Sequence, residues 1–159
     1  MSIQKTIKKF LREQKVKSIL KASKIGATTD LVLFQIKRNS ASTEIYDNIK
    51  TEFIKSSNHI RGVVGERYIS LLANENKQDY IMNAFEGNII SFQKRVACIV
   101  MDCSKIDNVS GIITYITSVL AEKNINLHGF FTSQDDITII IDEEKAFEYV
   151  DELKKILKN

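Results

Sequence analysis

The sequence predicts an α+β protein made of two ferredoxin-like βαββαβ units, with antiparallel sheets that carry helices on one face, behind an N-terminal helix. Short apolar runs rich in strand formers alternate with helical stripes. Corresponding elements recur at a spacing of roughly 65–70 residues, which indicates an internal repeat. The 159 residues include no proline and no Gly/Ser-rich linker, so connections should be short. We expect a basic lead-in segment over residues 1–25, a first unit over 26–94 and a second unit over 95–159.

The lead-in segment, residues 1–25, opens with a helical stripe and carries an excess of positive charge. The helical spacing of apolar residues is interrupted near residues 13–15. The pattern therefore does not decide whether residues 16–25 form a helix or a strand. Glu13 is the only acid among many cations. Such a cluster attracts phosphates or anionic lipid, and it is also typical of a solvated helix face. The cations are Lys5, Lys8, Lys9, Arg12, Lys15, Lys17, Lys21 and Lys24.

The first unit reads as strand, helix, two strands, helix and strand. Ser42 is the expected cap of its first helix, and Glu44 would oppose the helix dipole in the first turn. Asn74 can cap its second helix. The expected elements are a strand over 31–36, a helix over 42–55, strands over 60–64 and 67–73, a helix after residue 74 and a strand over 89–92.

The second unit repeats this order but stops after its second helix. Its first helix has a clean apolar face at residues 112, 113, 116, 119 and 120. Asp142 can cap the last helix, whose inward face we expect at Ala146, Phe147, Val150, Leu153 and Leu157. The strands are expected over 96–101, 125–131 and 137–141. The last of these is apolar almost throughout, which predicts burial on both of its faces.

The second unit therefore lacks a closing strand, and an open buried sheet edge would be costly. We expect the gap to be filled from elsewhere in the protein. The chain itself offers residues 16–22 or 24–27, and a second chain is the third candidate.

The composition excludes several protein classes. With 43% hydrophobic and 27% charged residues and a net charge of +3, the chain is not a disordered tail, a collagen or a disulfide scaffold. No apolar run approaches the roughly 20 residues that cross a bilayer, and no apolar segment follows the basic start as in a signal peptide. We expect a soluble cytoplasmic protein without membrane contact. Cys98 and Cys103 are expected to be reduced core thiols.

The usual equipment of an enzyme is missing from the sequence. His59 and His128 have no Cys, Asp or Glu at metal-ligand spacing. There is no phosphate loop, no dinucleotide glycine fingerprint and no nucleophile elbow. We expect no catalytic residues, no metal and no cofactor, although a site assembled in space from distant residues leaves no sequence signal.

The stretch from residue 96 to 157 resembles an ACT domain, the amino-acid-sensing module, and most of all the regulatory half of aspartokinases. The resemblance is carried by the helix-opening loop of residues 108–112 (NVSGI), by residues 125–127 (INL) where the family has Ile-Asn-Ile, by residues 132–134 (TSQ), and by residues 141–143 (IDE) before the last helix. Ser110 replaces the proline of the family loop, and Asn108 stands where a carboxylate is common. In aspartokinases two such units are interleaved, and a strand ahead of the first closes the sheet of the second. The kinase domain itself is absent from this chain.

The resemblance implies a binding site for an amino acid at the start of the helix after Gly111. Backbone amides there suit a carboxylate, and Gly111 permits close approach of a ligand. Asn108 and Ser110 are also ordinary capping residues, and His128 on a strand is equally a surface or core residue. The implied ligand-binding residues are Asn108, Val109, Ser110, Gly111, Ile112, Asn126, Leu127 and His128.

These features favour a non-enzymatic regulatory protein that binds a small effector, an amino acid, and regulates amino-acid metabolism through a partner enzyme. The family implies a homodimer. The alternative is a nucleic-acid-binding protein that uses its basic N-terminal helix, although its strands lack paired aromatics for stacking bases. An interaction scaffold that has lost its ligand is the third hypothesis.

Overall fold

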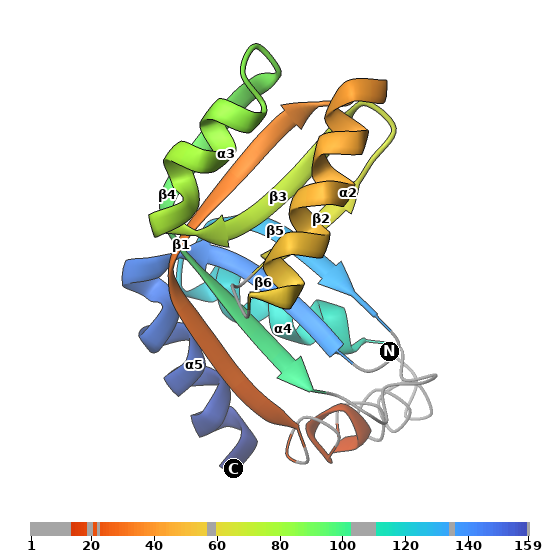
Figure 1. The fold of residues 1–159 in the computed structure, drawn as a ribbon. Helices are drawn as coiled ribbons and strands as arrows, with labels where there is room; N and C mark the ends of the chain where they lie inside the picture. Colours follow the sequence, from red (N-terminus) through yellow and green to blue (C-terminus); the bar gives the residue numbers. More distant parts are fainter. Residues whose placement is uncertain are drawn as a thin grey trace. The chain divides into compact units, whose positions relative to one another are not determined.

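The computed structural model describes residues 14–18, 21, 23–56, 60–102, 111–133 and 136–158. It divides into two compact units, one formed by Thr29–Val96 and the other by Met1–Thr28 together with Ala97–Asn159. The first is called the front unit below and the second the back unit. Two long strands, β1 (Lys24–Lys37) and β4 (Ile89–Asp102), contribute one half to each unit. Figure 1 shows the chain.

The front unit has the ferredoxin-like strand order β2-β3-β1-β4. Both neighbours of β3 run antiparallel to it. Its elements after β1 are α2 (Ser40–Lys55), β2 (Ile60–Val64), β3 (Tyr68–Asn74), the 3-10 turn η1 (Glu75–Lys77), α3 (Gln78–Ala84) and the first half of β4.

The core of the front unit lies between one face of this sheet and its two helices. Alternate residues of β1 and β3 point to that face, as the pairings of Phe34 with Leu71 and Ile36 with Ile69 show. Period-two alternation places every second side chain of a strand on the same face. The buried cluster comprises Val32, Phe34, Ile36, Ile69, Leu71 and Ala73 from the strands, Tyr46, Ile49 and Phe53 from α2, and Ile81 and Phe85 from the end of α3.

Two expected helix starts in this unit were wrong. The N-cap of α2 is Asn39 rather than Ser42, and Ser42 is instead the third helical residue. Glu44 consequently lies beyond the first turn, which contains no acid. Asn74 makes no side-chain cap, and a 3-10 turn separates it from α3.

The back unit has the same fold, with strand order β1-β4-β6-β5. Residues 24–28 of β1 belong to it and occupy the closing-strand position for which the sequence left three candidates. Its other elements are the second half of β4, α4 (Ile112–Glu122), β5 (Leu127–Thr132), β6 (Asp136–Asp142) and α5 (Glu143–Lys158). Residues 14–18 are helical, and Val16 is buried in the core of this unit.

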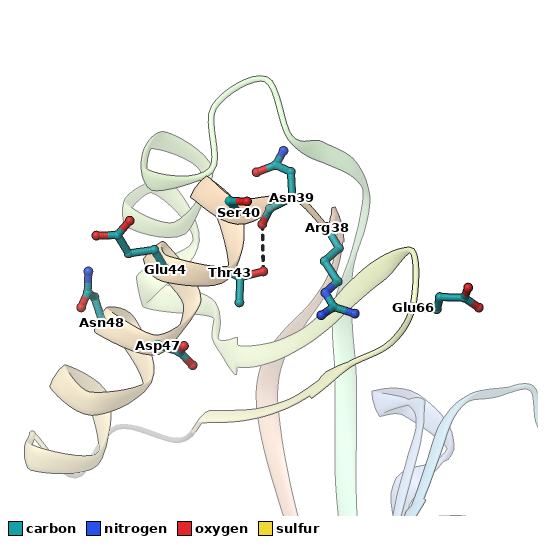
Figure 2. A pocket seen from close by; sticks show the side chains of 8 residues that line it. All are labelled: Arg38, Asn39, Ser40, Thr43, Glu44, Asp47, Asn48 and Glu66. Carbon is teal, nitrogen blue, oxygen red and sulfur yellow. Dashed lines mark hydrogen bonds between the residues drawn. The ribbon is translucent and has the colours of Figure 1, made fainter.

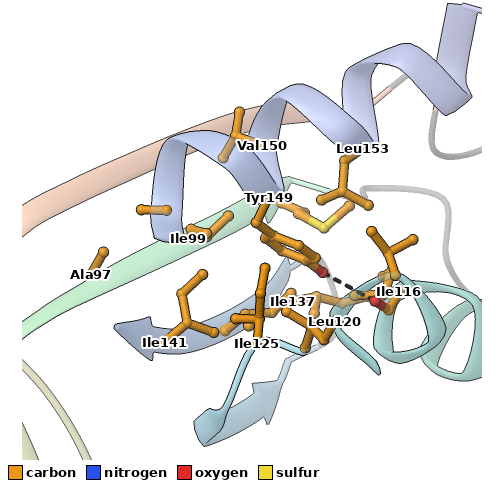
Figure 3. Packing of buried hydrophobic residues seen from close by; sticks show 14 of the residues in the cluster. Ala97, Ile99, Ile116, Leu120, Ile125, Ile137, Ile141, Tyr149, Val150 and Leu153 are labelled. Carbon is orange, nitrogen blue, oxygen red and sulfur yellow. Dashed lines mark hydrogen bonds between the residues drawn. The ribbon is translucent and has the colours of Figure 1, made fainter. Parts of the chain in front are cut away.

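The core of the back unit is formed by the sheet, α4 and α5 (Figure 3). Tyr149 is fully buried there, and its hydroxyl donates a 3.2 Å hydrogen bond to the carbonyl oxygen of Ile116 on α4. Burial raises the pKa of Tyr149 well above the usual value for tyrosine. Residues 137–141 are all buried, as the continuous apolar run predicts.

The expected inward face of the last helix was wrong at one position. Phe147 is 73% exposed, whereas Tyr149 takes the inward place. The buried residues 146, 149, 150 and 153 follow the spacing i, i+3, i+4 and i+7, and position 147 lies one step off this stripe. The side chain of Leu157 lies outside the described residues.

Both long strands extend beyond the predicted runs. The strand expected over 31–36 begins at Lys24, and those expected over 89–92 and 96–101 are one strand. The residues between lack a continuous apolar run, since Ile25 is the only large apolar residue of 24–30 and residues 93–95 are Gln, Lys and Arg. Both segments nevertheless belong to strands of the sheet.

Two expectations concern compartment and redox state. Cys98 is fully buried, as expected of a core residue, and Cys103 lies outside the described residues. In the part of the chain that the structure describes, no helix has both the length and the apolar character needed to span a bilayer.

Candidate functional site

The N-terminal end of α4 is the part of the predicted site that the structure describes best. Gly111 is the N-cap, with φ 102° and ψ −6°, a left-handed conformation that favours glycine. Its carbonyl accepts the N–H of Tyr115 over 2.9 Å. Gly111 has no side chain to accept the amides of the next turn, and α4 has no acid in its first turn. These amides and the positive end of the helix dipole suit a carboxylate. Asn108, Val109 and Ser110 lie outside the described residues.

Ile112, the next predicted site residue, points into the protein. It is only 2% exposed and packs in the core of the back unit. Its side chain therefore positions the start of α4 against the sheet, and only its backbone can face a ligand. Ile113 is half-exposed beside it.

Asn126, Leu127 and His128 lie just beyond the other end of α4. Asn126 and Leu127 are exposed. His128 is partly buried, and its Nε2 lies 2.9 Å from the Oδ1 of Asp142. A helix of the length of α4 spans roughly 16 Å, so Gly111 and these three residues stand at opposite ends of the back unit. A single small molecule bound to one copy of the unit does not bridge them.

A second polar site lies at the corresponding end of the front unit, where β1 leads into α2 (Figure 2). It is an open cavity of about 620 Å³. The Nη1 of Arg38 donates to the carbonyl of Gly65 over 2.9 Å, which ties this guanidinium to the turn between β2 and β3. Carboxylates from α2 and from that turn share the lining. The lining residues are Arg38, Asn39, Ser40, Thr43, Glu44, Asp47, Asn48 and Glu66.

The start of α2 differs from the start of α4 because its own side chains close it. The Oδ1 of Asn39 accepts the N–H of Ser42 over 2.8 Å, and the Oγ of Ser42 accepts the N–H of Asn39 over 2.9 Å. Ser42 also donates to the carbonyl of Lys37 over 2.8 Å. This is a reciprocal capping box. It occupies the donors that a bound carboxylate would otherwise use.

The sequence did not predict the pocket of the front unit because the loop before α2, residues 37–42, lacks the glycine that marks the ACT-like loop before α4. The signal that was present is Asn39 followed three residues later by Ser42, a pattern of helix starts. That signal gives the beginning of α2 but not the cavity, since only the folded β2–β3 turn brings Glu66 to the same cavity as Arg38. Within the described ranges, no group of three or more His, Cys, Asp or Glu side chains could hold a metal ion.

Residues 91–151 match the family model of the ACT domain. The match covers most of β4 and runs into α5, so it includes Gly111 and residues 126–128. The pocket beside α2 lies outside it. The comparison with curated proteins finds no match for this chain.

Solved structures of aspartokinase regulatory regions share the fold. The aspartokinase alpha and beta subunits align over 85% of this chain and 97% of that chain, with a TM-score of 0.68 and 13% identity. The ligand-free regulatory subunit of aspartate kinase from Thermus thermophilus aligns over 83% and 95%, with a TM-score of 0.64 and 11% identity. The aspartate kinase of Clostridium acetobutylicum aligns over 84% of this chain and 34% of that chain, with a TM-score of 0.67 and 14% identity. The chain thus corresponds to about a third of that last protein and to almost all of the first two.

Proposed function

We propose that this chain is a non-enzymatic regulatory protein that binds a small effector, an amino acid, and acts on a partner enzyme of amino-acid metabolism. The observation that carries the proposal is the start of α4 at Gly111 inside the ACT-matching segment. The similarity to regulatory subunits of aspartate kinase supports the same role. A cytoplasmic location fits this role.

The start of α4 offers hydrogen-bond donors for the carboxylate of a zwitterionic amino acid. The first-turn amides and the helix dipole stabilise a carboxylate, and a glycine at the N-cap lets it approach the backbone. Asn108 and Ser110 would add side-chain groups from the preceding loop, as the ACT resemblance implies. No carboxylate in the first turn of α4 competes for the same amides.

A homodimer would bring the predicted residues together. Gly111 and residues 126–128 lie at opposite ends of α4 within one copy. An effector that touches both groups would have to lie between two copies. We therefore propose that the effector binds at such an interface, so binding should depend on protein concentration.

A thermal-shift screen with the twenty amino acids tests the proposal. A ligand that binds only the native state adds about 2.7 kcal/mol of stability at one hundred times its Kd, so one or a few amino acids should raise the melting temperature. Gly111→Ala should abolish the increment, because an added Cβ strains a left-handed backbone position and would hinder the close approach of the carboxylate that we propose. Gly87→Ala is the matched control, since Gly87 also has positive φ, 75°, and its Cβ would meet no atom within 4 Å.

The two glycine variants separate binding from strain. Both variants place a side chain on a backbone of positive φ, 102° at Gly111 and 75° at Gly87, and only the first should lose the ligand response. A screen in which no amino acid shifts the melting temperature would reject the amino-acid effector and favour the scaffold hypothesis. A response that survives Gly111→Ala but disappears in Arg38→Ala would move the effector site to the pocket beside α2.

A further inference from the structure

The front unit has a second sheet face that its helices do not cover. The register places Lys37 opposite Tyr68 and Gln35 opposite Ser70, and these four residues alternate with the core residues of β1 and β3. Val63 of β2 pairs with Ser70 and so shares their face. This set, together with Arg61 of β2, is called the open face below.

The open face is accessible at the end where β3 begins. Tyr68 is 48% exposed and Lys37 is exposed beside it. The Oγ of Ser70 donates to the Oε1 of Gln35 over 3.0 Å. Towards the other end, Leu33 and Leu72 are buried. An aromatic ring therefore stands at the accessible end of a polar strip.

The open face carries positive charge and no carboxylate at its strand positions. Its two cations are Lys37 and Arg61, and Arg67 is an exposed cation directly before Tyr68. The N–H of Arg38 donates to the carbonyl of Arg67 over 2.9 Å, which fixes the backbone of Arg67 next to the end of β1. The other positions of β1, β2 and β3 on this face are neutral, namely 31, 33, 35, 63, 68, 70, 72 and 74, and the leucines among them are buried.

We propose that the open face binds single-stranded nucleic acid. One base would stack on the ring of Tyr68, and the flanking phosphates would lie against Lys37, Arg61 and Arg67. Gln35 and Ser70 offer an amide and a hydroxyl to the edge of a base. A single stacking ring fits a short, sequence-tolerant contact, weaker than that of sheets with two or three stacked bases.

The geometry sets the size of the expected effects. Base–aromatic stacking lost to alanine corresponds to a decrease in affinity of about 5- to 150-fold. Three phosphate contacts on a single strand predict a slope of about −2 for log K against log salt, and each cation removed should lower its magnitude by about 0.7.

Fluorescence anisotropy with the full chain tests the proposal, using labelled 12-mers of oligo(U) RNA and oligo(dT) DNA and a DNA duplex at low salt. We expect both single strands to bind more tightly than the duplex, and Tyr68→Ala to weaken them. Tyr80→Ala is the matched control, because Tyr80 is 43% exposed but belongs to α3 on the covered side of the sheet. Lys37→Ala should reduce the salt slope, and Lys50→Ala on the exposed side of α2 should not.

Three results would overturn the proposal. The first is no binding of either single strand at low salt. The second is binding that Tyr68→Ala and Tyr80→Ala affect equally, which would assign it to the basic N-terminal segment. The third is a preference for the duplex. None of them bears on the amino-acid screen, so the two proposals fail separately.

Discussion

Gly62 in β2 is the position where the packing of α2 on the sheet can be tested most directly. A Cβ at this position would lie 2.5 Å from the hydroxyl oxygen of Tyr46, 2.6 Å from Cε2 and 2.9 Å from Cζ. Carbon atoms in contact prefer a separation of about 3.5–4.0 Å. Tyr46 is only 3% exposed, so its ring has no open space to enter. Gly62→Ala must therefore displace either the ring or α2.

The expected loss of stability follows from two opposing effects. Inserting a methyl group into a packed core costs about 1–3 kcal/mol. Replacing glycine by alanine lowers the entropy of the unfolded chain and returns about 0.4–1 kcal/mol. We expect Gly62→Ala to lower the free energy of unfolding by about 1–2 kcal/mol, which corresponds to a decrease in melting temperature of about 2–8 °C for a chain of this length.

The assay is unfolding in urea, monitored by circular dichroism. Gly26→Ala in β1 is the control, because no atom lies within 4 Å of its built Cβ, and it should be neutral or stabilising. The double variant with Tyr46→Phe should recover part of the loss, since the nearest of the three contacts is then gone. Equal stability of Gly62→Ala and the unaltered protein would show that α2 does not pack on β2 as described.

Further predictions concern the two cores and can be read from the same denaturation curves. Tyr149→Phe should cost about 0.5–1.5 kcal/mol because it removes the hydrogen bond to the carbonyl of Ile116. Tyr149 keeps its proton in the folded state above the pKa of about 10 of an unfolded tyrosine, so its contribution to stability should be constant below pH 10 and decrease as pH rises beyond it. The free energy of unfolding should therefore fall less steeply above pH 10 in Tyr149→Phe. Ser42→Ala should cost about 1–2 kcal/mol through the lost capping box, whereas Ser40→Ala, its exposed neighbour, should change little. Phe147→Ser should be within about 0.5 kcal/mol of the unaltered protein, since this ring is in solvent.

The sequence was most informative where apolar periodicity is regular. Residues 112, 116, 119 and 120 of α4 are buried as expected, because a 3.6-residue period places them on one side of the helix. Ile113 was expected on the same face and is instead 51% exposed. The continuous run over 137–141 likewise predicted a strand buried on both sides. These elements obtain their stability from side-chain burial, which is the quantity that a hydrophobic pattern reports.

Elements held by pairing rather than burial were predicted less well. Asp30 and Arg95 lie inside β1 and β4 with φ of 57° and 55°, values that few residues other than glycine adopt. Neither position is a glycine, which is the residue that would have predicted this conformation. The burial pattern after Asp30 is the same as that after Arg95. In each strand four buried residues come next, then a half-buried residue and then one more buried residue. The repeat was therefore visible in the buried part of each strand but not in the less buried residues that precede it.

The two units share a strand order but differ at the start of the helix that follows their first strand, and this difference decides where an effector site can lie. An effector carboxylate at the start of α2 would have to displace Asn39 and Ser42 from each other, at a cost of about 1–2 kcal/mol for a lost cap. Within the described residues, α4 has no side-chain cap that an effector would have to displace at Gly111. We therefore place the proposed effector site at the start of α4 in the back unit and the proposed nucleic-acid contacts on the open face of the front unit.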